Sequence, residues 1–253
     1  MHQELIERFE LFAADPRAEE FDAALLVNCA VDSAADLSEV QKQTTKLIET
    51  CTHRDAPWVY LREAGFSGNT DASSVVVASC LDKLLETKRG LSISLGVLLI
   101  HLAKKLGHRA VGVNFPGNFL VRVNETLIDP HRMRETSEAD CLEQLGDIAD
   151  TGNYFATASP DEVALRMLNN LKHQYANDGQ WYRTLEMLDY QLALSPNNPH
   201  LYLERGQFWL RLGGITAAQD AFQQVLRLSP QGKLAEYASS RLADLKDQTE
   251  TLH

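Results

Sequence analysis

The feature that most constrains the fold is a short phrase that occurs twice near the end of the chain. LALSPNNP and LRLSPQGK place Pro196 and Pro230 34 residues apart. A fixed spacing of this length is typical of a helix–turn–helix unit that repeats along the sequence. One such unit cannot bury its apolar face alone, so neighbouring units stack on one another. The spacing therefore predicts that the last part of the chain is a stack of helix pairs.

The unit at about residues 199–232 closely resembles the tetratricopeptide repeat. Its signature positions carry the residues of that repeat, with small side chains where two helices cross: Tyr202, Gly206, Trp209, Gly213, Ala218, Phe222 and Pro230. We expect Trp209 and Phe222 to fill the space between the two helices. A further helix predicted at residues 233–247 would close the stack with a polar outer face, as the end of a repeat array requires.

The preceding unit, at about residues 165–198, matches the repeat less closely. Several of its residues fit the pattern: Leu168, Tyr175, Gly179, Leu188 and Pro196. Lys172 and Thr184, however, stand where the repeat has small residues. A helix begins just before this unit, because Ser159 is suited to cap a helix and Pro160 to occupy its first position. We therefore expect one domain at residues 1–158 and a tetratricopeptide-like all-α module at residues 159–253.

The first domain combines helices with a few short strands. Helical periodicity covers residues 4–13 and 36–51, and a long apolar helix is expected within residues 86–108. Two β-like runs, HRAVGVNF and NFLVRVNETLIDP, follow this helix and are separated by Pro116 and Gly117. Because Pro-Gly is a turn signal, the two runs should be antiparallel neighbours. Helices followed by strands in this order predict an α+β fold.

Four segments of this domain resemble the transglutaminase-like superfamily: GFSGN, LLETKRGLSISLGVLLIHLAKKLGH, VGVNFPGNFLVRV and LIDPHR. Together with the repeats that follow, they are most similar to the SirB-type family of bacterial proteins, which have a transglutaminase-like domain followed by tetratricopeptide repeats. The resemblance implies a helix-rich N-terminal domain of papain type. It also implies a site formed by a cysteine, a histidine and an aspartate, in that order along the chain.

The residues at these three positions differ from the superfamily's set. The resemblance assigns the cysteine position to Ser92, two residues after Gly90, the histidine position to Asn118, and the acid to Asp129. A serine hydroxyl is a poor nucleophile without an adjacent base, and a carboxamide does not take up a proton at physiological pH. We therefore expect no catalysis of the cysteine type here, so that the three positions form a vestigial site.

Two other roles for this site follow from the residues around it. His131 is the one histidine that could approach the serine, so the alternative function is a hydrolase or acyltransferase with an altered Ser92-based site. The cleft could also bind a small molecule or peptide without turnover. We favour a structural role, in which Ser92 or Ser94 caps the helix and Asp129 bonds nearby backbone or Arg89.

A degenerate site combined with a repeat module indicates a non-catalytic protein-interaction or regulatory factor. The first helix of each repeat pair lines the groove in which such modules bind peptides. The candidate partner-binding residues on these helices are Arg166, Asn169, His173, Leu203, Gln207, Arg211 and Arg241. Their positive bias would suit an acidic or C-terminal peptide. The alternative is that the first domain fills the groove and that these residues make contacts only within the chain.

Composition argues against several other classes of protein. The net charge of −11 disfavours nucleic-acid binding, because an acidic surface repels the phosphate backbone. The four cysteines stand far apart and lack metal-ligand spacing, so we expect no metal or other cofactor. We expect the thiols to be reduced, as is typical of the cytosol. The longest apolar run, residues 97–102, is far shorter than the roughly 20 residues that span a bilayer. The acidic, amphipathic start is unlike a signal peptide. We expect a cytoplasmic protein without membrane association.

Overall fold

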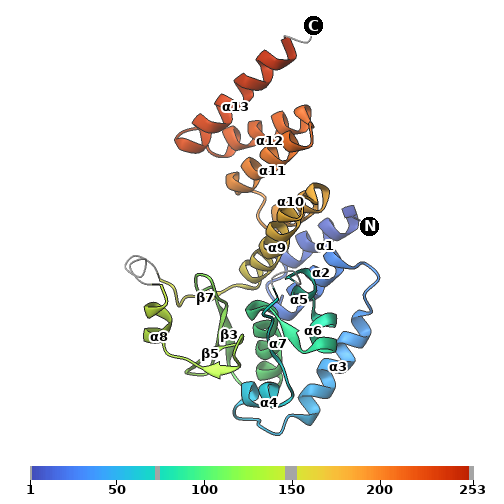
Figure 1. The fold of residues 1–253 in the computed structure, drawn as a ribbon, viewed down its shortest axis with the longest axis vertical. Coiled ribbons are helices and arrows are strands. Elements are labelled where there is room, and N and C mark those ends of the chain that lie inside the picture. Colours follow the sequence, from blue (N-terminus) through green and yellow to red (C-terminus); the bar gives the residue numbers. More distant parts are fainter. Residues whose placement is uncertain (1, 72–74, 146–152, 251–253) are drawn as a thin grey trace. The chain divides into compact units, whose positions relative to one another are not determined.

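The computed structural model describes residues 2–71, 75–145 and 153–250, which form two compact units (Figure 1). The first, which we call the αβ unit, comprises residues 12–167, and the second, the helical unit, comprises residues 1–11 and 168–253. The expected order of an α+β domain followed by a helical module is confirmed. The domain boundary expected between residues 158 and 159 stays a prediction, since the compact units divide at residue 167 instead.

The core of the αβ unit is built around one long apolar helix, α7. After α1 (His2–Ala14), the helices are α2 (Glu20–Val31), α3 (Leu37–Thr50), α4 (Pro57–Glu63), α5 (Val75–Ser79), α6 (Leu81–Thr87), α7 (Ser92–Lys105) and α8 (Glu138–Glu143). Ile93, Leu95 and Leu99 of α7 are at most 1% exposed. The helix expected within residues 86–108 is confirmed, and Gly107, in the left-handed conformation with φ 93°, follows its end.

One five-stranded antiparallel sheet lies beside α7 (Figure 1). Its strands are β3 (Ala110–Val113), β4 (Leu120–Val123), β5 (Thr126–Asp129), β6 (Arg134–Glu135) and β7 (Thr157–Ala158), in the order β6-β5-β4-β3-β7. A separate parallel pair joins β1 (Ser67–Gly68) to β2 (Arg89–Gly90). The predicted antiparallel pairing of the two β-like runs is confirmed for β3 and β4. The second run contains two strands, because the chain turns at Asn124, whose φ is 51°.

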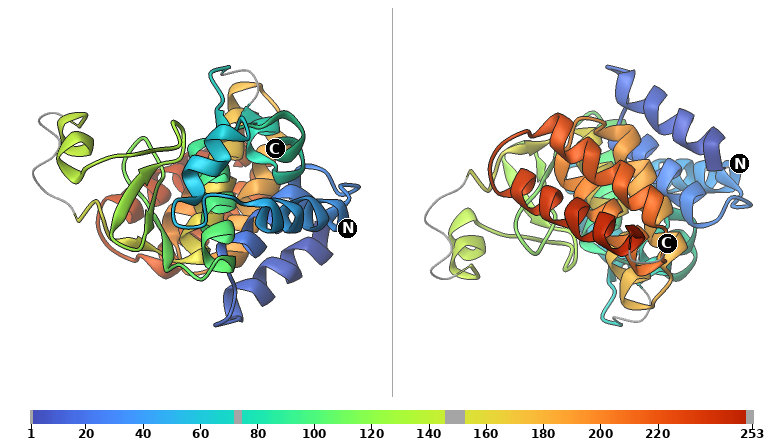
Figure 2. Two further views of the ribbon diagram at one scale, coloured as in Figure 1. Left: turned by 90° about the horizontal axis from the view of Figure 1, so that it is seen from below. Right: turned by 90° about the horizontal axis from the view of Figure 1, so that it is seen from above.

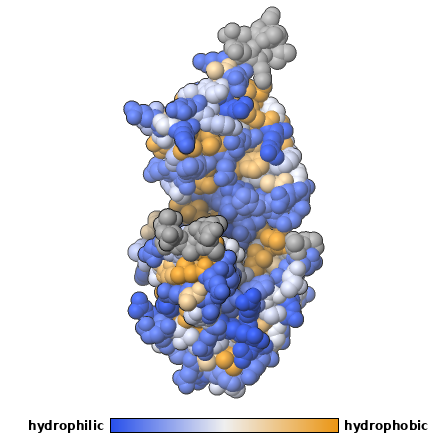
Figure 3. All heavy atoms as spheres, turned by 60° about the vertical axis from the view of Figure 1, so that its left-hand side comes forward, coloured by the Kyte–Doolittle hydropathy of each residue, from blue (hydrophilic) through white to orange (hydrophobic). Residues whose placement is uncertain are grey.

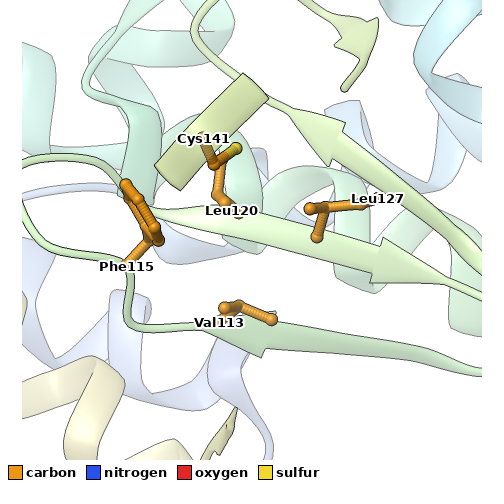
Figure 4. Close-up of a cluster of buried hydrophobic side chains, with 5 residues drawn as sticks. All are labelled: Val113, Phe115, Leu120, Leu127 and Cys141. Atoms are coloured by element: carbon orange, nitrogen blue, oxygen red, sulfur yellow. The ribbon is translucent and has the colours of Figure 1, made fainter. Parts of the chain in front are cut away.

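The two faces of this sheet are covered by different helices. A hydrophobic cluster on one face is formed by Val113, Phe115, Leu120, Leu127 and Cys141, with Cys141 contributed by α8 (Figure 4). On the opposite face α7 approaches β4 closely, because a Cβ atom at Gly96 would lie 3.2 Å from the Val121 side chain. The strands alternate their side chains between these two faces. Residues at the ends of β4 and β5 therefore lie at the border between α7 and α8.

The helical unit consists of successive antiparallel helix pairs. Its helices are α9 (Pro160–Asn177), α10 (Trp181–Leu194), α11 (Pro199–Arg211), α12 (Ile215–Leu228) and α13 (Lys233–Glu250), and α11 to α13 lie side by side (Figures 1 and 2). The predicted packing in the second repeat is confirmed: a Cβ atom at Gly206 would lie 2.6 Å from Phe222, which is 0% exposed. The predicted cap is also confirmed, since Glu162 N–H donates to Ser159 Oγ at 3.2 Å.

The first helix contacts the repeats through its N-terminal half, which the sequence did not indicate. His2 Nδ1 lies 2.9 Å from the Tyr190 hydroxyl of α10, and its Nε2 lies 3.3 Å from a carboxylate oxygen of Asp189. The rings of Phe9 and Tyr190 pack with centroids 5.1 Å apart. Residues 2–11 therefore supply one further helical surface against α10.

The surface is mainly hydrophilic on the face seen in Figure 3, where hydrophobic areas are small and interrupted. Among the described residues, no helix has both the length and the apolar character needed to cross a lipid bilayer.

Candidate functional site

Ser92 begins α7, and its hydroxyl reaches the neighbouring strand. Ser92 Oγ accepts a hydrogen bond of 3.1 Å from the backbone N–H of Phe119. The expected capping role of the serines is wrong, because Leu91 occupies the N-cap position and no side chain caps the helix there. Ser94 instead donates its hydroxyl proton toward the carbonyl oxygens of Ala78, at 2.6 Å, and Leu91, at 3.1 Å. The two serines thus tie the start of α7 to β4 and α5.

The position of the Phe119 backbone depends on two glycines. Phe119 is 0% exposed. A Cβ atom at Gly96 of α7 would lie 2.6 Å from its ring, and a Cβ atom at Gly112 of β3 would lie 2.4 Å from it. Real Cβ atoms do not approach so closely, since interiors are already close-packed. The two glycines therefore form the space that holds Phe119, and with it the residue before it, Asn118.

Asn118 and Asp129 meet at the ends of β4 and β5. The Asn118 side-chain amide donates to Asp129 Oδ1 across 3.4 Å. Asp129 is 8% exposed, and its Oδ1 also accepts the backbone N–H of His131 at 2.9 Å. The expected bond from Asp129 to nearby backbone is confirmed, whereas Arg89 donates to the carbonyl of Gly65 at 2.7 Å. The structure therefore brings the three positions of the superfamily site together through Phe119.

His131 is held away from solvent on one side by a glycine. A Cβ atom at Gly68 would lie 2.0 Å from His131 Nδ1, so the imidazole ring lies directly on the Gly68 backbone. The Gly68 N–H also donates to the His131 carbonyl at 2.7 Å. Within the described ranges, no hydrogen bond joins His131 to Ser92. The glycine of the GFSGN segment thus has a specific role, to admit the His131 ring.

An open pocket of about 470 Å³ lies beside these residues. The residues that line it come from the turn between β3 and β4, the end of β5 and the end of α8: Phe115, Pro116, Gly117, Asn118, Asp129, His131, Arg132, Gln144 and Leu145. Ser92 does not line it. The pocket therefore presents an amide, a carboxylate, an imidazole and a guanidinium group, which can orient a polar ligand.

One predicted partner-binding residue, Arg166, lies in the αβ unit. Its guanidinium donates to the Phe115 carbonyl at 2.9 Å and lies 5.8 Å from the centre of the Phe119 ring. Burial lowers the pKa of Arg166 from its usual value, because the charged form loses its water. Arg166 thus makes contacts within its own chain, as in the alternative to partner binding that the sequence left open.

The other six predicted residues lie on the first helices of the pairs, Asn169 and His173 on α9, Leu203, Gln207 and Arg211 on α11, and Arg241 on α13. Gln207 is joined to α13 by a 3.1 Å bond to the Tyr237 hydroxyl. The Arg241 guanidinium lies over the same ring, 5.1 Å from its centre.

Arg211 lies over two aromatic rings at another part of this surface. Its guanidinium is 5.0 Å from the centre of the Trp181 ring and 5.7 Å from that of Phe208. Trp181, Phe208 and Tyr237 were not among the predicted residues of this surface. For Phe208 and Tyr237 the sequence holds a signal, because each ring stands three or four residues before an arginine on the same helix.

Among the described residues, the thiols and the acidic side chains form no further chemical centre. Cys51, Cys80 and Cys141 are buried and Cys29 is half-buried, and none of the four is in a disulfide. Burial raises the pKa of Cys80 to about 12, so this thiol is unreactive at neutral pH. In the part of the chain that the structure describes, no three His, Cys, Asp or Glu side chains are grouped to hold a metal ion.

Comparison with known proteins agrees with this architecture. A family model described as "Transglutaminase-like superfamily" matches residues 35–169, and one described as "Tetratricopeptide repeat" matches residues 171–243. A UPF0162 protein of Xylella fastidiosa is 30% identical over 205 residues, covering 76% of this chain and 73% of that protein. Protein SirB1 of Salmonella typhimurium is 23% identical over 239 residues, covering 90% and 85% respectively. A UPF0162 protein of Pseudomonas aeruginosa is 27% identical over 196 residues, covering 75% and 73%. No solved structure matches the chain.

Proposed function

We propose, from the premise that this chain belongs to the transglutaminase-like superfamily and to the UPF0162 family within it, that it is a non-catalytic protein-interaction or regulatory factor. In this proposal the αβ unit keeps the scaffold of a thiol enzyme without its chemistry. The helical unit supplies the surface that binds a protein partner. The four cysteines, none of which is in a disulfide, fit a reducing compartment, and we place the protein in the cytoplasm.

The observation that carries the proposal is the bond between Asn118 and Asp129. In a papain-type site the acid orients a histidine, and the histidine accepts the proton of the nucleophile. Here the acid orients an amide, which cannot accept a proton. The Ser92 oxygen accepts a backbone N–H rather than facing a base. The site therefore keeps the acid of the superfamily's set and lacks both the thiol nucleophile and the base that would activate it.

The competing proposal is a serine enzyme in which His131 serves as the base. One observation favours it, since His131 lines the same pocket as Asp129. Against it, His131 bonds Asp129 through its backbone N–H, not through its ring, and the ring lies on Gly68. For this enzyme to work, the His131 ring would have to leave Gly68 and reach Ser92.

Covalent labelling separates the two proposals. We expect a fluorophosphonate probe, which reacts with activated serines, to leave Ser92 of the full-length protein unlabelled. The positive control is the double variant Ser92→Cys/Asn118→His, which restores a thiol and a base on the same scaffold. Its thiol should react with iodoacetamide about tenfold faster at pH 6 than that of Ser92→Cys alone, because a nearby imidazolium favours the thiolate. Labelling of the wild type that is lost in Ser92→Ala would establish a serine enzyme instead.

The partner is proposed to bind the helical unit across the first helices of its pairs. Exposed arginines and aromatic rings on α11 and α13 favour a peptide that carries carboxylates. The test is affinity capture with the wild type and with the variant Arg211→Glu/Asn169→Ala. The matched control is Arg227→Glu, which makes the same charge change at an exposed position of α12. A partner kept by Arg227→Glu and lost by the double variant supports the proposal. A partner kept by all three proteins contradicts it.

A further inference from the structure

The αβ unit has a second pocket, which shares no lining residue with the pocket described above. It has a volume of about 550 Å³, within the range of roughly 300–1,000 Å³ that is usual for small-molecule sites. Its lining comes from α3, from α4 and the residues that follow it, and from α6 and the residue that follows it: Glu39, Lys42, Gln43, Lys46, Leu47, Thr50, Tyr60, Ala64, Phe66, Leu85 and Lys88. None of these residues belongs to the superfamily site.

The charge in this pocket is opposite to that of the whole chain. Three lysines and one glutamate line it, in a protein with a net charge of −11. The glutamate, Glu39, is already engaged, since it accepts the Gln43 amide at 2.9 Å and lies 3.8 Å from the Lys42 ammonium. In the described ranges the Lys46 ammonium has no carboxylate within ion-pairing distance. By contrast, Lys83 and Lys104 are paired with glutamates at 3.0 and 2.6 Å.

The backbone of Lys88 indicates that this side chain is placed with some strain. Lys88 follows α6 with φ 59°, in the left-handed region where glycine is the usual residue. Its ammonium crosses to α4 and donates to the Ala64 carbonyl at 2.6 Å. That carbonyl is neutral, and among the residues that the structure describes no carboxylate lies within ion-pairing distance of the Lys88 ammonium. Non-glycine residues in this conformation are enriched at binding and active sites.

The two lysines of α3 also repel each other. Lys42 and Lys46 are four residues apart, so they lie on the same side of the helix, one turn from each other. Like charges at this spacing destabilise a helix. An anion between them would remove this repulsion. The floor of the pocket, in contrast, is apolar: Phe66 is 3% exposed and Leu85 is 9% exposed.

From this combination we propose that the pocket between α3, α4 and Lys88 binds a small organic anion, a phosphate or carboxylate carried on an aromatic or aliphatic body. The ammonium groups of Lys46 and Lys88 would bind the anionic group, with Lys42 at the rim. Leu47, Phe66 and Leu85 would contact the apolar body. The proposal is independent of whether the helical unit binds a protein partner.

Calorimetric titration of the full-length protein with three probes tests this ligand class. The probes are 1-naphthyl phosphate, 1-naphthol and inorganic phosphate, which carry both features, only the apolar body, and only the anion. We expect 1-naphthyl phosphate to bind at least about tenfold more tightly than either of the others, a difference of roughly 1.4 kcal/mol. Equal binding of 1-naphthol, or no binding of 1-naphthyl phosphate, would overturn the proposal.

Matched lysine variants test the location. Lys46→Gln and Lys88→Gly should each weaken binding of 1-naphthyl phosphate about fivefold, because each removes one of the two uncompensated charges. Lys88→Gly also removes the strain of the left-handed backbone, because glycine adopts this conformation readily. The thermal stability of this variant should therefore be equal to that of the wild type or higher. A loss of binding in a variant of this stability cannot be due to misfolding. The control Lys105→Gln removes the same charge from an exposed position on α7. If Lys105→Gln weakens binding as much as the pocket variants do, the attraction is a general effect of charge and the site is wrong.

Discussion

The candidate site of the αβ unit and the first repeat of the helical unit both depart from the pattern of their families, and they do so in different ways. At the site, Ser92 and Asn118 replace reactive groups, and each makes a hydrogen bond that keeps the surrounding backbone in place. In the first repeat, Lys172 and Thr184 replace small packing residues. Lys172 is 2% exposed and is ion-paired with Glu204 of α11, and Thr184, which is 0% exposed, donates to the Gln180 carbonyl at 3.1 Å.

The two regions therefore differ in the features that their fold needs. At the site, the chemistry has changed while the packing of Phe119 between two glycines holds the geometry. In the repeat, the packing has changed, and a charge pair replaces what a small residue would provide. The site should therefore be sensitive to changes in Phe119 and tolerant of changes in its polar residues. The repeat should be sensitive to the loss of a polar partner.

The largest effect is expected for Phe119→Ala. Removing a fully buried phenylalanine costs about 3–5 kcal/mol, because the ring's contacts are lost and a cavity remains. The two glycines beside it have no side chains that could move into this space. Urea unfolding followed by circular dichroism measures the loss. A loss below about 1 kcal/mol would mean that the site's geometry does not depend on this ring.

The next effect separates the two partners of the ion pair in the first repeat. Glu204→Ala leaves the Lys172 ammonium buried without a counter-charge and should cost about 3 kcal/mol. Lys172→Met removes the buried charge itself and leaves Glu204, which is 38% exposed and can be hydrated. Its cost should be within about 1 kcal/mol, as for other buried pairs replaced by apolar groups. Equal losses in the two variants would show that the pair stabilises the repeat by its attraction alone.

These two regions also show what the sequence could predict. The 34-residue spacing and the small residues at Gly206 and Ala218 were enough for the repeats, because helix packing depends on local pattern. The positions of Ser92, Asn118 and Asp129 followed from the resemblance, and the structure brings them together. The hydrogen bonds of Ser92 and Asn118 did not follow, since the bond from Phe119 N–H to Ser92, for example, joins residues 27 apart in sequence. The contact of His2 with Tyr190, 188 residues apart, was beyond any local signal for the same reason.

A half-buried histidine extends the comparison to pH. His101 of α7 stacks on Phe21 with ring centroids 3.9 Å apart, and burial, together with the charge of Lys105, lowers its pKa to about 4. Whereas Lys172 has a charged partner, His101 is therefore neutral in the folded protein at pH 7. As the pH falls below about 6.5, the unfolded chain takes up this proton first, so the folded state loses stability between about pH 6.5 and pH 4.

The size of this pH effect is moderate because the His101 ring is partly exposed. The full shift would correspond to about 2 kcal/mol at pH 5, and solvent reduces it to about 1 kcal/mol. His101→Phe keeps the stacking and cannot be protonated, so it should lose about 1 kcal/mol less than the wild type between about pH 7 and pH 5. Urea unfolding at both pH values measures the difference. An identical loss in both proteins would show that other groups cause the acid sensitivity.

The smallest effects are expected for the two polar substitutions themselves, which makes them the most direct test of the comparison. Thr184→Ala restores a small residue in the first repeat. Alanine favours the helix, while the hydroxyl's bond to the preceding turn is lost, so the net change in the free energy of unfolding should be within about 0.5 kcal/mol.

Asn118→Ala loses only the long bond to Asp129 at a half-buried position, which should cost about 0.5 kcal/mol. If Asn118→Ala instead costs as much as Phe119→Ala, the amide, rather than the packed ring, holds the site together. In that case Asn118 is a structural replacement for the histidine, and restoring the histidine would not restore the site.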